Sequence, residues 1–181
     1  TIPDRTAYII NESMDDPYPY LLDDCKTLQN MGVKMISIPC NTSCYFHEKL
    51  QNEIDVPINN LVKNTVKYIN ERGFKKVAVL ATKGTIKSNL YQKELEKNGI
   101  DYICPKTDEV MEIIYGYVKS GRDVSPEKFK NITKDIDVDG IILGCTELSI
   151  LKGKLNLDDK YIDPLEIEVK NILNFFGKGR W

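Results

Sequence analysis

Two cysteines in matched settings are the residues of this chain best suited to chemistry. Cys40 follows the apolar run Met35–Ile38 and a proline, and Cys145 follows the run Gly140–Gly144. Small hydrogen-bonding residues come after each thiol. Two acid–base groups that face one carbon atom from opposite sides can invert its configuration, because one removes a proton while the other returns a proton to the opposite face. The sequence therefore predicts a proton-transfer site built on two thiols.

A structural role is the alternative for each cysteine. A free thiol at the end of a buried strand often packs as a small apolar group, and for a single cysteine this interpretation ranks first. However, the same arrangement occurs at two predicted strand ends, where Cys40 is followed by Asn-Thr and Cys145 by Thr. This repetition favours a catalytic role for both cysteines over a structural one. Cys25, on an apolar helix face, and Cys104, before a proline, are interpreted as core residues.

A third stretch adds groups that could bind an anion. The apolar run Lys76–Ala81 predicts a buried strand, and Thr82-Lys83-Gly84-Thr85 follows it directly. Hydroxyl groups and backbone N–H groups in a strand-to-helix turn can hold a carboxylate. Many turns of this kind have no ligand, so the motif is informative only together with the two cysteine motifs.

The elements that must position these residues alternate between strand and helix patterns. Such alternation predicts an α/β fold with mainly parallel sheets flanked by helices, in which ligands bind at the carboxyl ends of the strands. The recurrence of the cysteine motif predicts two lobes related by an approximate two-fold axis, with the active site in the cleft between them. The predicted first lobe comprises residues 1–60 and 163–181, including a returning C-terminal helix, and the second lobe comprises residues 61–162.

Composition narrows the class of protein. The 181 residues are 41% hydrophobic, enough to bury a core, and the net charge of −2 gives no reason to expect nucleic acid or a membrane surface as partner. No apolar run approaches the ~20 residues of a membrane-spanning helix, and no signal-peptide pattern is present, so we expect a cytoplasmic protein. Five cysteines without disulfide-scaffold spacing predict reduced thiols. Cys40 and Cys44 lack a second pair at zinc spacing, so no metal is expected.

The two motifs together resemble a known family. Pro39-Cys40-Asn41-Thr42 and Gly144-Cys145-Thr146-Glu147 are similar to the motifs of the aspartate/glutamate racemases, which racemise amino acids without pyridoxal phosphate. Glu147 resembles the aspartate racemase branch, because the glutamate branch typically has histidine there. The resemblance runs from Ile2 to about Asp163. It implies interconversion of L- and D-aspartate by a two-cysteine, two-base mechanism, with no cofactor and commonly as a homodimer.

The resemblance also implies roles for individual residues. Cys40 and Cys145 are the expected catalytic pair, and Asp4 and Lys119 are expected to support them, with Lys119 close to a thiol. The expected substrate contacts are Arg5, Asn41, Thr42, Thr82, Thr85, Thr146 and Glu147.

Three of these roles have a stated chemistry. Arg5 would pair with the side-chain carboxylate of the substrate, Thr85 would contact its α-carboxylate, and Glu147 would bind its ammonium group. Without the resemblance, Arg5 would be interpreted as part of a surface ion pair. Lys119 fits equally well as a helix-terminal lysine that complements the helix dipole.

Several alternatives stay open. Relatives generally begin with a strand and a glycine-rich turn of the form Gly-Gly-Met-Gly-Pro before the segment similar to Pro3-Asp4-Arg5, whereas this sequence opens at Thr1. The resemblance therefore predicts a first lobe without its first strand, either because the native protein is longer or because the segment has been lost.

The protein could instead racemise glutamate or many amino acids, or bind an acidic amino acid without catalysis. Other relatives act on hydantoins, maleate or malonates; paired cysteines argue against the one-cysteine decarboxylases, and Arg5 favours a dicarboxylic amino acid.

Overall fold

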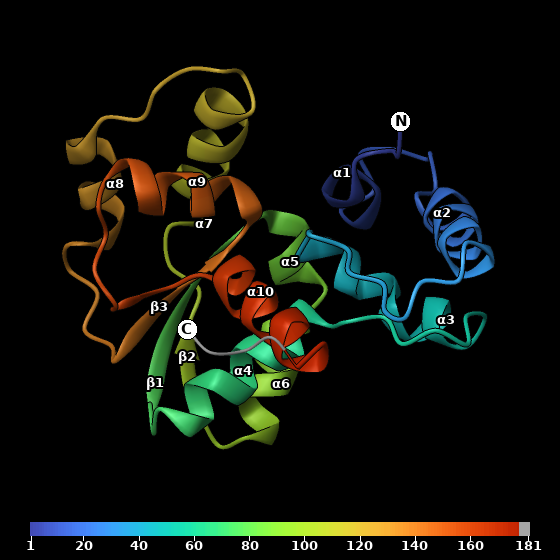
Figure 1. Ribbon diagram of the computed structural model, residues 1–181. Helices are drawn as coiled ribbons and strands as arrows, with labels where there is room; N and C mark the ends of the chain where they lie inside the picture. The colour runs from blue at the N-terminus through green and yellow to red at the C-terminus, as the bar shows by residue number, and fades with distance from the viewer. Residues whose placement is uncertain (178–181) are drawn as a thin grey trace.

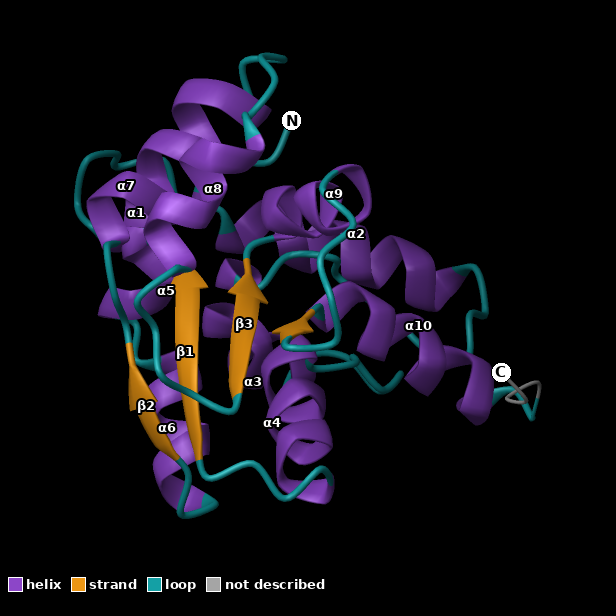
Figure 2. Cartoon of the chain, turned by 90° about the vertical axis from the view of Figure 1, so that its left-hand side faces the viewer, coloured by secondary structure: helices purple, strands orange, loops and turns teal. Residues whose placement is uncertain are grey.

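A four-stranded parallel sheet is the centre of the computed structural model, which describes residues 1–177. Its order is β2-β1-β3-β4 (Figure 2). The strands are β1 (Lys76–Ala81), β2 (Asp101–Ile103), β3 (Gly140–Gly144) and β4 (Tyr161–Ile162). Ala81 pairs with Gly144 in the register of β1 and β3, so the two central strands end at the same level. The residues that follow them, Thr82 and Cys145, are thereby brought to one edge of the sheet.

Helices connect and cover the strands. The first part of the chain forms α1 (Arg5–Ile9), α2 (Tyr18–Asn30), the 3-10 helix η1 (Thr42–Phe46) and α3 (His47–Gln51). The helices that accompany the sheet are α4 (Leu61–Glu71), α5 (Lys83–Lys87), α6 (Leu90–Lys97), α7 (Thr107–Met111), the π-helix η2 (Glu112–Val118), α8 (Pro126–Thr133), α9 (Thr146–Lys154) and α10 (Pro164–Phe175). Within residues 1–177, none of the helices is both long enough and apolar enough to cross a membrane.

The two faces of the sheet bury different hydrophobic clusters. Successive side chains of a strand point to opposite faces, so Leu80 and Leu143 pack with α7, η2, α8 and α9, whereas Val79 and Ile142 pack with α4, α6 and α10. The two central strands, β1 and β3, are buried on both sides, as their continuous apolar runs predicted.

The first sixty residues have a hydrophobic cluster of their own, formed mainly by α2, η1 and α3. In Figure 1 these helices lie to one side of the sheet. The only strand-like pairing in this segment is one isolated parallel bridge between Ile36 and Ile58. The prediction of two sheets is therefore wrong for residues 1–177, which contain one. Met35–Ile38 is also no doubly buried strand, because only Ile36 is fully buried there. A lone pair of short segments without further strands does not form a stable sheet.

The last helix contacts both parts of the molecule. Ile167 of α10 belongs to the cluster on the sheet, where α10 packs on α4. Glu168, the next residue, is 3% exposed and accepts a hydrogen bond of 2.6 Å from Ser37 in the first part of the chain. The helix thus contacts the first part of the chain through Glu168, while it packs mainly on α4 and the sheet. Residues 178–181 of the predicted first lobe lie outside the described residues.

Candidate active site

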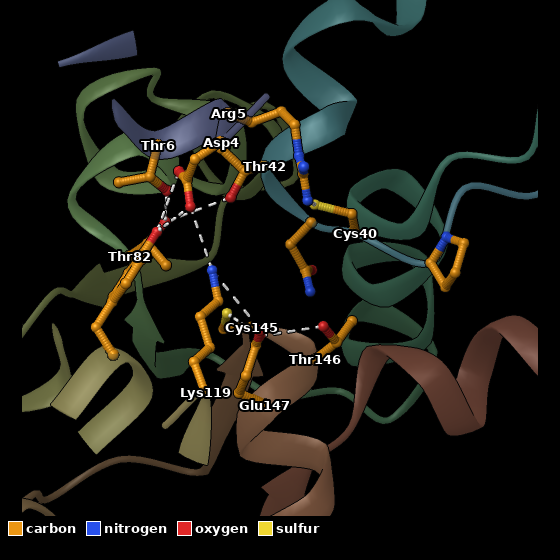
Figure 3. Close-up of a pocket in the computed structure, with 13 residues that line it drawn as sticks. Asp4, Arg5, Thr6, Cys40, Thr42, Thr82, Lys119, Cys145, Thr146 and Glu147 are labelled. Carbon is orange, nitrogen blue, oxygen red and sulfur yellow. Dashed lines mark hydrogen bonds and ion pairs between the residues drawn. The ribbon is translucent and has the colours of Figure 1, made fainter. Parts of the chain in front are cut away.

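A cavity of about 60 Å³ lies beyond the carboxyl ends of β1 and β3, where parallel sheets bind their ligands. It brings together every site residue predicted from the sequence except Thr85, and adds Thr6, Pro39 and Tyr115. The lining consists of Asp4, Arg5, Thr6, Pro39, Cys40, Asn41, Thr42, Thr82, Tyr115, Lys119, Cys145, Thr146 and Glu147 (Figure 3).

The N-terminal segment reaches the cavity because α1 docks tightly on α5. Asp4 caps α1 by accepting a hydrogen bond of 3.0 Å from the backbone N–H of Ala7. A Cβ atom at Gly84 would stand 2.7 Å from the Cα atom of Thr6, so this approach requires glycine. The hydroxyl of Thr6 also donates to that of Thr82 at 2.9 Å. These contacts place Asp4 and Arg5 at the edge of the sheet.

Buried threonine hydroxyls connect three segments behind the cavity. The oxygens of Thr42 and Thr85 are 2.8 Å apart, and those of Thr82 and Thr85 are 3.2 Å apart. Thr42 and Thr82 line the cavity, whereas Thr85 is fully buried behind them. Thr85 therefore orients the hydroxyls that face the cavity, and its expected contact with a substrate carboxylate stays a prediction.

Cys40 lies beside a cation. Nη2 of Arg5 is 3.6 Å from the sulfur of Cys40, and Nη1 donates to the carbonyl of Pro3 at 3.0 Å. Burial lowers the pKa of Arg5, but the neighbouring Cys40 and Asp4 more than offset this and raise it above its ordinary value. A guanidinium group at this distance stabilises negative charge on sulfur. Arg5, expected to pair with a substrate carboxylate, thus also contacts the sulfur of Cys40.

Cys145 lies beside an anion. It is 8% exposed, stands directly before α9, and its thiol donates to Oε2 of Glu147 at 2.8 Å. The hydroxyl of Thr146 donates to the same oxygen at 3.2 Å. Burial and the negative charge of Glu147 raise the pKa of the Cys145 thiol well above its usual range. Glu147, expected to contact substrate, therefore also binds the second thiol, and Thr146, expected to do the same, donates to Glu147.

The π-helix η2 supplies a tyrosine to the site, and Lys119, the residue directly after it, supplies a cation. Nζ of Lys119 is 3.3 Å from Oδ2 of Asp4 and 3.8 Å from Oε1 of Glu147, and it lies between the two carboxylates in Figure 3. The hydroxyl of Tyr115 donates to both oxygens of Asp4, at 3.2 and 3.0 Å. Lys119 thus reaches the second thiol through Glu147.

Tyr115 was missed by sequence reasoning. The stretch that contains it forms the short α7 followed by the π-helix η2. The N–H of Lys119 donates to the carbonyl five residues earlier, Ile114, at 2.8 Å. π-Helices are rare and often occur at functional sites. A tyrosine four residues before the expected supporting lysine was the available signal.

Asn41 has one fixed side-chain atom and one free atom. The hydroxyl of Tyr91, on α6, donates to its Oδ1 at 2.5 Å. Its Nδ2 is buried and has no hydrogen-bond partner within residues 1–177. Since a buried donor without a partner costs free energy, this group is suited to donate to a ligand in the cavity.

Comparisons with known proteins agree with this geometry. The profile of the Asp/Glu/hydantoin racemase family matches residues 1–172. The glutamate racemase of Aquifex pyrophilus is 32% identical over 170 residues, covering 90% of this chain and 64% of that protein. The broad specificity amino-acid racemase of Bacillus subtilis is 28% identical over 169 residues, covering 90% of this chain and 73% of that protein.

A solved structure is also similar along nearly the whole chain. The aspartate racemase of Picrophilus torridus superposes with a TM-score of 0.84 and 26% sequence identity, covering 97% of this chain and 76% of that one. This chain spans 64% of the length of the Aquifex pyrophilus enzyme. The family profile, the relatives and the cavity between two cysteine motifs lead to one conclusion: the chain belongs to the Asp/Glu/hydantoin racemase family.

Proposed function

We propose that this protein is a cofactor-independent racemase that interconverts L- and D-aspartate by two-base proton transfer at Cα. One observation carries the proposal: two thiols line one small cavity, and their partners have opposite charges. The cation Arg5 lies beside Cys40, and the anion Glu147 lies beside Cys145. A base and an acid are thereby available to the same carbon atom, as stereoinversion needs.

In the proposed reaction, the thiolate of Cys40 removes the α-proton. The Cα–H bond breaks, an S–H bond forms on Cys40, and the electron pair left on Cα spreads into the α-carboxylate. The S–H bond of Cys145 then breaks, its proton bonds to the opposite face of Cα, and the electron pair stays on sulfur. The other enantiomer reacts with the two roles exchanged.

Groups around the cavity would bind the α-carboxylate. The free Nδ2 of Asn41 and the hydroxyls of Thr42, Thr82 and Thr146 line the cavity. Negative charge builds up on the carboxylate as the proton leaves, and fixed donors stabilise such charge most effectively in the transition state. Arg5 would pair with the side-chain carboxylate, since a guanidinium group can hold a carboxylate by two hydrogen bonds.

Aspartate is the proposed substrate because Glu147, which lines the cavity, resembles the aspartate racemase branch, whereas the glutamate branch typically has histidine at this position. The similarity to an aspartate racemase structure supports the same choice. Glutamate or broad-specificity racemisation is the second candidate, favoured by the sequence matches to a glutamate racemase and a broad specificity racemase. The third candidate function is the binding of an acidic amino acid without catalysis.

For the architecture, we propose two lobes related by an approximate two-fold axis, with the cavity between them. Residues 1–60 and 163–181 would form one lobe and residues 61–162 the other. The separate hydrophobic cluster formed by α2, η1 and α3 supports this division. A homodimer of such chains is also proposed.

A chiral assay tests the substrate assignment. The protein is incubated without pyridoxal phosphate with L-aspartate, L-glutamate or L-alanine, and the enantiomers are separated by chromatography. We expect D-aspartate to appear fastest. Faster formation of D-glutamate would transfer the proposal to the second candidate, and binding of aspartate by calorimetry without any D-product would favour the third.

A further inference from the structure

Glu147 occupies a position that its expected role as an ammonium ligand does not explain. Its Oε2 accepts from the thiol of Cys145 at 2.8 Å and from the hydroxyl of Thr146 at 3.2 Å. Its Oε1 is 3.8 Å from the ammonium group of Lys119. The side chain is only 20% exposed, so these partners, rather than water, surround the carboxylate.

Lys119 is held in place from the other side. Tyr115 donates to both oxygens of Asp4, and Asp4 pairs with Lys119 at 3.3 Å. Nζ of Lys119 also lies 4.0 Å from the centre of the Tyr115 ring. Burial of Lys119 lowers its pKa, but Tyr115, Asp4 and Glu147 together raise it above its ordinary value, so the side chain stays charged.

We propose that Glu147 is a positioning residue that keeps the proton on the sulfur of Cys145, with Lys119 as its countercharge, and so makes Cys145 the acid of the resting enzyme. The inference rests on the proposed racemase function, because only a reaction at two thiols requires that one of them be protonated. It gives Glu147 a role directed at the thiol instead of at the substrate ammonium.

The charges at each stage of the reaction explain why both Glu147 and Lys119 are needed. A carboxylate that accepts from an S–H group stabilises the thiol and repels the thiolate. When Cys145 gives its proton to Cα, the sulfur and Glu147 are both negative, and Lys119 limits the cost of that state. When the opposite enantiomer reacts, its α-proton bonds to the sulfur and restores the S–H group. Glu147 alone would hold the proton too tightly to release it.

Other ionisable groups around the second thiol belong to several elements. Besides Glu147 on α9 and Lys119 at the end of η2, these are Asp4, Arg5, Cys40, Tyr91 and Tyr115. Among the hydrogen bonds of residues 1–177, the sulfur of Cys145 donates to Glu147 alone. Burial and Glu147 raise the pKa of Cys145, in agreement with the geometry.

Titration of the thiol itself tests the inference. The protein is labelled with 13C at the cysteine Cβ positions, the Cys145 signal is assigned by its loss in Cys145→Ser, and its shift is followed against pH. In Glu147→Gln, which keeps the side-chain shape, we expect the midpoint of Cys145 to fall by about one pH unit or more. In Lys119→Met we expect it to rise.

Opposite shifts separate this role from simple damage to the fold, which would expose the thiol and move both midpoints in one direction. Glu166→Gln is the matched control, because Glu166 pairs with Lys152 on the outside of α10 and should leave the Cys145 midpoint unchanged. An unchanged or raised midpoint in Glu147→Gln would overturn the inference. The titration uses no substrate, so its result is independent of whether the protein racemises aspartate.

Discussion

At the scale of single residues, the two thiols differ in their partners although their sequence settings match. A guanidinium group contacts Cys40, and a carboxylate accepts the proton of Cys145. The two thiols are therefore unequal in their electrostatic surroundings, with a cation beside one and an anion beside the other. Arg5 comes from a segment distant from Cys40 and is not part of a strand-end pattern, whereas Glu147 belongs to the motif that follows β3.

The hydrogen bond from Tyr91 to Asn41 should be important for stability. Tyr91→Phe leaves Oδ1 of Asn41 buried without a donor, which costs about 1–3 kcal/mol. We expect the free energy of unfolding in urea to fall by this amount. Tyr102→Phe is the matched control, because its hydroxyl donates to Glu96 in an exposed position and should change stability by less than about 0.5 kcal/mol. Equal effects of the two variants would refute the role given to Tyr91.

Asp4 should contribute to stability in a pH-dependent way. Its burial raises its pKa, but the N–H of Ala7, Lys119 and Tyr115 together lower the pKa below the ordinary 3.8. A lowered folded-state pKa means that the contribution is complete above 3.8 and is lost as the pH falls through the folded value. The stability difference between wild type and Asp4→Asn, which can still cap α1, should therefore shrink from about pH 6 to about pH 3. Urea unfolding at several pH values measures it, and a constant difference would contradict the assignment.

Sequence reasoning found the residues with distinctive chemistry and missed those defined by contacts. Cys40, Cys145 and the threonine-containing turn stand at ends of apolar runs, which is a local signal. Tyr115 and Tyr91 reach the site from helices whose apolar spacing also explains a tyrosine as a core residue. Their roles depend on which segments of the chain lie next to each other in the fold, and the spacing of nearby residues does not predict this.

At the scale of elements, the junction of α1 and α5 decides whether the site is complete. Gly84→Ala would place a Cβ atom 2.7 Å from the backbone of Thr6, and overpacking of this kind costs about 1–3 kcal/mol. We expect lower stability in urea unfolding and a loss of racemase activity, because Asp4 and Arg5 move with α1.

Gly153→Ala is the control for this junction. Gly153 lies in α9 with no atom within 4 Å of an added Cβ, so alanine there should be neutral or stabilise by about 0.5–1 kcal/mol. If Gly84→Ala behaved like Gly153→Ala, the close docking of α1 would not be needed for the site.

The elements also show where sequence patterns succeed. Lys76–Ala81 and Gly140–Gly144 formed strands as predicted, because each run is long, apolar and paired on both sides within the sheet. Met35–Ile38 has a similar composition but pairs only through the bridge between Ile36 and Ile58. The difference lies in the number of neighbouring strands, which a single run of residues does not reveal.

At the scale of the whole molecule, α10 joins the sheet to the first part of the chain. The buried Glu168 accepts from Ser37 at 2.6 Å and from Asn64 at 3.4 Å. Hydrogen bonds to a charged group contribute about 1.5–3 kcal/mol each when well formed. This contact therefore fixes the segment before Cys40 relative to the strands that carry Thr82 and Cys145.

Glu168→Ala should loosen that connection. We expect faster hydrogen exchange at residues 33–59, while the amides of β1 and β3 stay protected, because the sheet clusters are intact. Glu166→Ala on the same helix is the control, since its ion pair with Lys152 is partly exposed and contributes at most about 1 kcal/mol. Uniform acceleration across the sheet would show that Glu168 supports the whole fold instead.

The central claim is two-thiol racemisation, and proton NMR of L- and D-aspartate in deuterated water tests it most directly. With the wild-type protein, and without pyridoxal phosphate, we predict loss of the α-proton signal from both enantiomers together with racemisation. Cys40→Ala and Cys145→Ala should each stop racemisation, and any exchange that survives should affect one enantiomer in the first variant and the other enantiomer in the second. Racemisation by either variant at the wild-type rate, or an unchanged α-proton signal with both aspartate and glutamate in the wild type, would contradict the account.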